Sequence, residues 1–278
     1  MDASSTYLPF HSVVTAPGSN PGRYMFVLHG IFGSGGNFRT FIRRLVDACP
    51  QWGFVLVDLR GHGQSLGAPP PHTVESAAQD LVRLGEHLGL NFRGIMGHSF
   101  GGKVALAYAA LRPDELDEVW VLDSTPSVRA DGMKTVGAAH VLDTLDALPA
   151  TFPTREFFFE HMSASGMNRP EIEWLAMNVR RDGDAFRFRL DLPTIRALLE
   201  DYFTRDLWFV VEQSDARRRL GYVIGGRSIT VSPADRDRLS KLAATNSKLE
   251  VHMLEKADHW VHVDDPDGLF EILRRALC

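Results

Sequence analysis

The sequence has only two cysteines, Cys49 and Cys278, in 278 residues. Because they lie far apart in the chain, we expect no disulfide framework and favour a reducing compartment. The opening residues, MDASSTYLPF, lack a basic region followed by an apolar core, so they indicate no signal peptide. No apolar run approaches the roughly 18 residues of a membrane span. These absences predict a soluble cytoplasmic protein with no membrane partner.

The chain also lacks a strong excess of either charge. It has 30 Lys and Arg against 35 Asp and Glu, a formal net charge of −5 at pH 7. A nucleic-acid partner normally requires a basic footprint, so the composition argues against one. Hydrophobic residues make up 44% of the chain and charged residues 23%, which is an ordinary globular composition. A chain of this length can form one α/β domain with a sizeable core.

Short apolar runs alternate with helical patterns along much of the sequence. Residues 7–15 are expected to form an antiparallel edge strand or hairpin. Nearly continuous apolar runs are typical of central parallel strands covered on both faces, so the alternation predicts a mostly parallel, doubly wound α/β sheet. The strand-like runs are 24–30, 53–63, 93–99, 118–124, 220–226 and 248–254, and the helical patterns are 37–49, 73–89, 101–113, 233–245 and 266–277.

This alternation stops between about residues 125 and 213, where no convincing strand pattern occurs. Helical runs occupy the interval instead, at 136–148, 155–162, 170–179 and 193–203. A helical stretch between two strands of one sheet is typical of an insertion. We therefore expect a core formed by 1–124 and 214–278, with 125–213 as a helical cap. The cap should lie over the carboxyl ends of the strands, where open α/β sheets bind ligands.

The stretch GIMGHSFGGKVALAYA, residues 94–109, places Ser99 between Gly97 and Gly101. A strand pattern precedes this serine and a helical pattern follows it. That context is typical of a nucleophile elbow, a sharp strand-to-helix turn that needs small neighbours. The N-terminal end of the following helix also favours developing negative charge. A glycine-rich turn without chemistry is the alternative, but the flanking strand and helix favour Ser99 as a nucleophile.

A serine hydroxyl needs a base to become a good nucleophile. In enzymes with a nucleophile elbow, the triad residues follow in the order Ser, acid, His. The late segment EKADHWVHVDDP offers His259 and His262. We predict that His259 is the base, because it comes first after the strand, and we interpret His262 as a packing or capping residue. The H-x-x-H spacing is also compatible with a metal site, but no HExxH motif or cysteine cluster accompanies it, so we expect no metal.

The tetrahedral intermediate of acyl transfer needs two N–H donors for its oxyanion. The backbone N–H of Phe100, directly after the nucleophile, is one candidate. The loop LHGIFGSGGN should supply the other, and Ile31 is the candidate there. Glycines in this loop let the backbone approach a ligand. Their spacing does not match G-x-G-x-x-G and no GK[ST] follows, so we expect no nucleotide cofactor.

Four motifs resemble the α/β-hydrolase superfamily: LHGIFGSGGNFR, VDLRGHGQS, MGHSFGGKVAL and ADHWVHVDDP. They resemble most a group of small bacterial esterases and thioesterases that has a mitochondrial relative, over about residues 24–273. The resemblance implies the α/β-hydrolase fold. It leaves the substrate open, since members cleave esters, thioesters, amides, lactones, epoxides and carbon–carbon bonds. Arg60, His62 and Ser65, in the second motif, are interpreted as a turn held by hydrogen bonds.

The sequence departs from the common superfamily pattern at the triad acid. Most α/β-hydrolases carry the acid just after the strand that reads LGYVIGG here, and this chain has Ser228 at that place. The next acidic candidate, Asp235, falls inside a predicted helix. Asp123, at the end of VWVLDS, is therefore the predicted acid, and the esterases that the chain resembles likewise place theirs after that strand. The alternative is a strand-end carboxylate that caps a loop.

Two groups of side chains in the predicted cap each allow two interpretations. Four arginines could attract an anionic acyl carrier, although arginines interleaved with acidic residues are more typical of a solvated face; they are Arg180, Arg181, Arg187 and Arg189. Large apolar side chains could line an acyl pocket or pack the cap against itself; they are Phe157, Phe158, Phe159, Met162, Trp174 and Met177.

We therefore expect a serine hydrolase that acts on a small or medium carboxylic ester or thioester, without a cofactor. Ser99 would attack the carbonyl, His259 would move the proton, and Asp123 would orient the imidazole. Carbon–carbon hydrolysis or acyl transfer by the same triad is an alternative, as is a ligand sensor with little turnover. The sequence sets neither the acyl length nor the oligomeric state.

Overall fold

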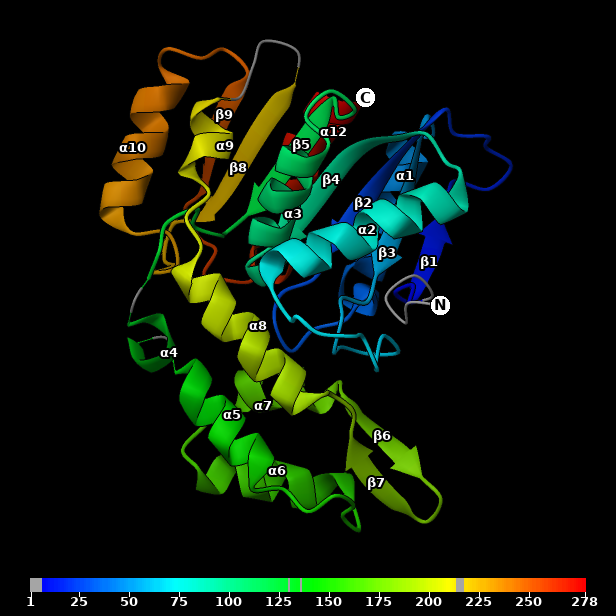
Figure 1. Cartoon of the computed structure of the whole chain (residues 1–278), viewed down its shortest axis with the longest axis vertical. Coiled ribbons are helices and arrows are strands. Elements are labelled where there is room, and N and C mark those ends of the chain that lie inside the picture. The colour runs from blue at the N-terminus through cyan, green and yellow to red at the C-terminus, as the bar shows by residue number, and fades with distance from the viewer. Residues whose placement is uncertain (1–6, 130, 136, 214–217) are drawn as a thin grey trace.

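A computed structural model of the chain describes residues 7–129, 131–135, 137–213 and 218–278. Its centre is a seven-stranded sheet in the order β1-β3-β2-β4-β5-β8-β9 (Figure 1). β1 pairs antiparallel with β3, as expected of an edge strand, and the other strands run parallel. The strands are β1 (His11–Val14), β2 (Arg23–Leu28), β3 (Trp52–Val57), β4 (Phe92–His98), β5 (Glu118–Leu122), β8 (Arg219–Gly225) and β9 (Leu249–Leu254).

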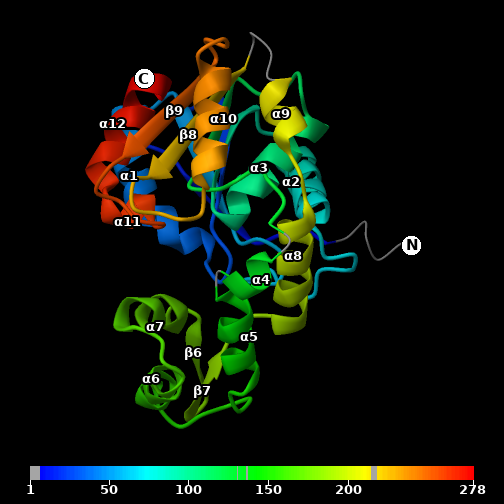
Figure 2. The ribbon, with the colours of Figure 1, turned by 90° about the vertical axis from the view of Figure 1, so that its left-hand side faces the viewer.

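Helices cover both faces of this sheet, and Figure 2 shows the two layers on either side of it. Alternate residues of β2 explain why its buried part is apolar on both faces: Met25 and Val27 pack with α1 and α12, whereas Phe26 and Leu28 pack with α2 and α3. The sequence prediction of a mostly parallel, doubly wound sheet is confirmed. The core helices are α1 (Arg39–Ala48), α2 (Val74–Leu88), α3 (Phe100–Leu111), α10 (Pro233–Ala243), α11 (Val261–Asp264) and α12 (Pro266–Leu277), with a short 3-10 helix η2 (Gly35–Phe38).

Residues 125–213 leave the sheet after β5 and return before β8. Figure 1 shows most of this segment as a separate lobe beneath the ends of the parallel strands toward which their arrows point. Among the described residues of the whole chain, no helix combines the length and apolarity needed to cross a membrane. The elements of the segment are α4 (Gly132–Thr135), α5 (Ala138–Asp146), α6 (Arg155–Ala164), α7 (Arg169–Ala176), β6 (Val179–Asp182), β7 (Ala185–Phe188), α8 (Leu192–Thr204) and α9 (Trp208–Glu212).

The segment is not purely helical, which corrects the sequence prediction. β6 and β7 form an antiparallel hairpin in which Asp182 pairs with Ala185 across a two-residue turn. Gly183 occupies that turn with φ +62°, a conformation that glycine adopts readily. The sequence RRDGDAFRF contains this turn, but its strands are too short to produce a clear alternation. Residues 1–6, 136 and 214, on which the signal-peptide, helix and cap-boundary predictions partly depend, lie outside the described residues.

A buried lysine of α3 connects this segment to the core. The Nζ of Lys103 donates hydrogen bonds to three carbonyl oxygens: Ser127 at 2.8 Å, Tyr202 at 2.7 Å and Arg205 at 2.8 Å. Ser127 lies where the segment begins, and the other two lie where α8 ends. Burial lowers the pKa of Lys103 to about 7, although the carboxylate of Asp206 opposes this shift. One ammonium group therefore holds both linkers of the segment.

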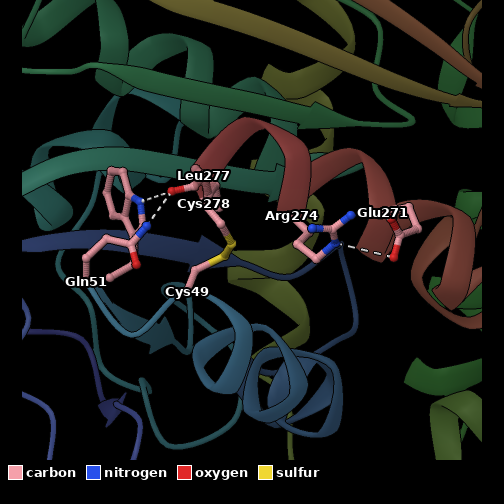
Figure 3. Close-up of a disulfide and its surroundings, with 7 residues drawn as sticks. Cys49, Gln51, Glu271, Arg274, Leu277 and Cys278 are labelled. Atoms are coloured by element: carbon pink, nitrogen blue, oxygen red, sulfur yellow. Dashed lines mark hydrogen bonds and ion pairs between the residues drawn. A yellow bond between two sulfur atoms is a disulfide. The ribbon is translucent and has the colours of Figure 1, made fainter.

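The structure joins Cys49 and Cys278 in a disulfide (Figure 3), so the expectation of no bridge was wrong. Their Cα atoms are 5.2 Å apart although 229 residues separate them in sequence. The two cysteines end α1 and α12, which pack on the same face of the sheet. Side chains of Gln51 and Trp52 also donate to the Leu277 carbonyl, at 2.7 and 3.2 Å. The separation of the two cysteines in sequence was therefore a poor guide to their distance in space. The prediction of a reducing compartment, which rested on unpaired cysteines, loses its support. A cytoplasmic location stays a prediction.

Replacing Cys278 with serine should lower the free energy of unfolding by roughly 2–4 kcal/mol, because the bridge restricts the unfolded chain. Urea denaturation under non-reducing conditions measures the difference. Reduced wild-type protein should unfold like Cys278→Ser, and reductant should leave the variant unchanged. Equal stability of the oxidised wild type and the variant would show that the bridge does not stabilise the fold.

Candidate active site

Ser99 lies at the sharp turn between β4 and α3. Its backbone has φ 52° and ψ −115°, a strained conformation for a residue with a side chain. A Cβ at Gly97 would collide with the Gly101 backbone, and a Cβ at Gly101 would lie 2.6 Å from the His29 carbonyl oxygen. The two glycines of the motif are therefore required by close backbone packing, as a nucleophile elbow demands.

The structure brings Ser99, His259 and Asp123 together from three separate segments. His259 Nε2 lies 3.0 Å from Ser99 Oγ, and His259 Nδ1 lies 2.7 Å from Asp123 Oδ2. His259 follows β9, whereas Asp123 directly follows β5 and has φ 43°. A proton on Nδ1 that is directed at the carboxylate leaves Nε2 as the acceptor for the serine hydroxyl. The arrangement can abstract a proton from Ser99.

The carboxylate of Asp123 is completely buried and has two further donors. Gly225 N–H donates to Oδ1 at 3.0 Å, and Ser228 Oγ donates to Oδ2 at 2.5 Å. Ser228 occupies the place where the common superfamily pattern has its acid, so here a hydroxyl supports the carboxylate from the neighbouring strand. Thr230 was not foreseen: its N–H donates to Ser228 Oγ, and its own hydroxyl lies 3.0 Å from His259 Nδ1.

Asp235, the rival acid, faces other partners. Its carboxylate accepts hydrogen bonds from Thr125 Oγ1 at 2.7 Å and from Ser127 Oγ at 2.6 Å. Its backbone N–H bonds to Ser232, the N-cap of α10. Asp235 thus connects the start of α10 to the residues that follow Asp123, and it makes no hydrogen bond to His259 among those of the described residues.

The two predicted oxyanion donors flank the elbow. Phe100 is the first residue of α3, and Ile31 belongs to the loop after β2. That loop lies against the elbow, because a Cβ at Gly30 would be 3.3 Å from Ser99 Cβ. The next N–H of the loop, that of Phe32, already donates to His62 Nε2 at 3.2 Å. Ile31 is therefore the candidate donor of this loop.

The turn after β3 contacts the loop of residues 29–37, which carries Ile31 and which we name the oxyanion loop. Burial lowers the pKa of His62 well below its ordinary value, so this ring is a neutral acceptor for the loop. His29 Nε2 likewise accepts a hydrogen bond from the Leu59 N–H at 2.9 Å. Arg60 is buried and pairs with Asp80 through two hydrogen bonds of 2.7 and 2.9 Å. These hydrogen bonds hold the turn, as its sequence predicted for Arg60 and His62.

His262 packs against aromatic rings beside the site. Its ring centroid lies 4.3 Å from that of Phe38 and 5.0 Å from that of His98. Burial lowers the pKa of His262 to about 3, so the ring is neutral at physiological pH. His98 also has a pKa well below its ordinary value because of burial, and its Nε2 donates to the His259 carbonyl at 2.7 Å. His259 therefore has a neutral imidazole next to it, because its ring centroid lies 4.7 Å from that of His98.

A small cavity of about 10 Å³ lies between the oxyanion loop and the segment of residues 125–213. That volume holds about one water molecule. Trp174 of α7 lines it together with Trp260, and their ring centroids are 5.6 Å apart. Trp174 also contacts Phe32 at 5.9 Å between centroids. Within the described ranges, no cluster of three or more His, Cys, Asp or Glu could hold a metal ion.

The model of the alpha/beta hydrolase fold family matches residues 24–161. The sn-1-specific diacylglycerol lipase ABHD11 of Mus musculus is 28% identical over 254 residues, which cover 90% of this chain and 80% of that protein. Esterase YbfF of Escherichia coli (strain K12) is 28% identical over 270 residues, 95% of this chain and 96% of that protein.

Solved structures show the same fold. An esterase of a marine microorganism superposes with a TM-score of 0.80 at 22% identity, covering 97% of this chain and 99% of that one. An esterase of Mycobacterium tuberculosis superposes with a TM-score of 0.68 at 26% identity, covering 97% of this chain and 92% of that one. The α/β-hydrolase fold predicted from the motifs is confirmed.

Asp123→Asn should lower kcat on a p-nitrophenyl ester by about 10²- to 10⁴-fold, because the histidine loses the carboxylate that fixes its tautomer. Asp235→Asn is the matched control and should remain within a few-fold of wild type. Steady-state kinetics on folded protein would measure both variants. The opposite ranking would assign the triad acid to Asp235.

Proposed function

Because the chain belongs to the α/β-hydrolase superfamily and has esterase relatives, we propose that it is a serine hydrolase of small to medium carboxylic esters or thioesters. The observation that carries this proposal is the continuous hydrogen-bond chain from Ser99 through His259 to Asp123, with distances of 3.0 and 2.7 Å. The relatives at 28% identity are named as an esterase and a lipase, which favours ester cleavage over carbon–carbon hydrolysis or acyl transfer.

In the proposed reaction, Ser99 Oγ attacks the carbonyl carbon while His259 Nε2 takes the hydroxyl proton. The tetrahedral intermediate collapses when the carbon–oxygen or carbon–sulfur bond to the leaving group breaks and His259 returns the proton to it. Water then attacks the acyl-enzyme with His259 as base. The acid is released and the Ser99 hydroxyl is restored.

The charges that develop in this reaction have fixed partners. The N–H groups of Ile31 and Phe100 would hold the oxyanion, and they need no reorganisation because each belongs to a packed turn. Asp123 would stabilise the imidazolium. Its buried carboxylate already accepts hydrogen bonds from Gly225 and Ser228, so the charge remains in place throughout the cycle.

We assign residues 125–213 the role of a cap over this site. The segment supplies Trp174 to the wall of the small cavity, which Gly30 and His98 also line. Phe158, in contrast, is fully buried and its ring stacks on that of Phe188 at 5.6 Å. The two alternatives for the cap aromatics therefore apply to different residues, with Trp174 at the acyl site and Phe158 in the cap interior.

Ser99→Ala should reduce kcat by roughly 10⁴-fold or more, since no other group supplies the nucleophile. It should also abolish labelling by a fluorophosphonate probe. Ser240→Ala, at an exposed position of α10, is the control and should behave like wild type. Turnover by Ser99→Ala close to that of wild type, or a fluorophosphonate adduct on another residue, would refute the assignment.

Trp174→Ala should shift the preferred acyl length toward longer chains, while the rate on an acetyl ester changes less, because the substitution enlarges the small cavity. Hydrolysis of p-nitrophenyl esters of graded length measures the shift. Phe158→Ala should instead lower activity on all lengths alike through loss of cap packing. An equal effect of Trp174→Ala on every length would give Trp174 a packing role only.

A further inference from the structure

A second, larger cavity lies on the other side of the oxyanion loop. Its volume is about 270 Å³, and it opens between the loop, the edge strand β1 and the hairpin β6–β7, which Figure 1 shows on the same side of the molecule as β1. Three arginines line it, and we name it the arginine pocket. Its polar lining includes Arg39, Asp58, Gln64, Asn178, Arg180 and Arg189.

The three arginines come from distant parts of the chain. Arg39 begins α1, where its Nη2 donates to Ser12 Oγ at 3.0 Å. Arg180 lies in β6, and its Nη1 donates to the carbonyl of Met177 at 2.5 Å. Arg189 follows β7 and is exposed. A guanidinium carries five N–H donors, so each of these contacts leaves donors for a ligand in the cavity.

One carboxylate, that of Asp58, also lies in the wall. It is buried and already accepts two backbone hydrogen bonds, from Gly35 N–H at 2.8 Å and from Gln64 N–H at 2.9 Å. Asp58 therefore serves to hold the two loops of the cavity. Three arginines against this single carboxylate give the cavity a positive field, although the whole chain carries a net charge of −5.

The arginines of the hairpin are thus not equivalent. Arg180 and Arg189 line the cavity, whereas Arg187 forms an ion pair with Asp182 at 2.9 Å and does not line it. The interpretation of these arginines as a solvated face therefore applies to Arg187. Arg180 and Arg189 instead line the same cavity as Arg39 of the core.

The arginine pocket and the small cavity lie on either side of the same loop. Gly33 and Asn37 line the small cavity, whereas Ser34, Gly35 and Gly36 line the arginine pocket. Asn178 adds a second connection, because this wall residue donates from Nδ2 to the Phe32 carbonyl of the same loop at 2.7 Å. A ligand in the pocket would contact the loop that carries the proposed oxyanion donor.

We propose that the arginine pocket is a binding site for a phosphate or pyrophosphate group. Convergent arginines match the planar, bidentate recognition of phosphate oxygens, and the cavity has room for a group larger than one phosphate. The group belongs either to the leaving portion of a substrate or to a separate effector, and the chemistry of the site is the same for both. The binding itself does not depend on the proposed hydrolysis.

Isothermal titration with pyrophosphate tests the site in the intact protein. We expect saturable binding that weakens with added salt. Arg39→Gln, Arg180→Gln and Arg189→Gln should each weaken it about 5-fold or more, since each removes charge-assisted hydrogen bonds. Arg187→Gln is the matched control from the same hairpin and should bind like wild type. No saturable binding at millimolar pyrophosphate, or equal weakening by Arg187→Gln, would overturn the proposal.

Kinetics then distinguish the two sources of the phosphate. If it belongs to the substrate, Arg180→Gln and Arg189→Gln should raise KM for acetyl-coenzyme A about 5-fold or more and leave kinetics on p-nitrophenyl acetate unchanged. If it belongs to an effector, pyrophosphate should alter hydrolysis of the neutral ester by wild type but not by the two variants. Ser99→Ala, which should abolish both hydrolyses while retaining pyrophosphate binding, separates failure of the proposed hydrolysis from failure of the site.

Discussion

A carboxylate without solvent exposure must be paired, because an unpaired charge in the interior costs several kcal/mol. Asp123 meets this requirement with His259, Gly225 and Ser228. These partners come from the ends of β8 and β9, so one buried charge fixes how three neighbouring strand ends are positioned. The same network positions His259, the proposed base, next to Ser99. The candidate site depends on this network more than on any property of the serine itself.

The local parts of the site could be predicted from the sequence because they leave local patterns. The elbow needs glycines at fixed positions around Ser99, and a histidine just after a strand has few alternatives. Asp123 followed from the absence of an acid at Ser228. Thr230 left no such pattern, because its contact with His259 depends on how two loops meet in space. The same limit hid the pairing of Cys49 with Cys278, which only the packing of α1 on α12 makes visible.

The oxyanion loop separates the two cavities of the molecule described above. One side faces the small cavity lined by Trp174 and Trp260, and the other faces the arginine pocket. The Phe32 N–H donates a hydrogen bond to His62, and the Phe32 carbonyl accepts one from Asn178. The loop is therefore held by one partner from the core and one from the segment of residues 125–213. A change in the position of that segment would be transmitted to the loop through Asn178.

Lys103 contacts the segment of residues 125–213 near both of its ends, through carbonyls of Ser127, Tyr202 and Arg205. One lysine of the core thus binds the two linkers that join the inserted segment to the sheet. Caps of different size could replace one another in evolution or in a designed chimera, provided that their two linkers return main-chain oxygens to the same ammonium group. Transplantation that ignores this contact would leave a buried cation without acceptors. Diversification of the cap is thus easiest between the linkers and most restricted at them.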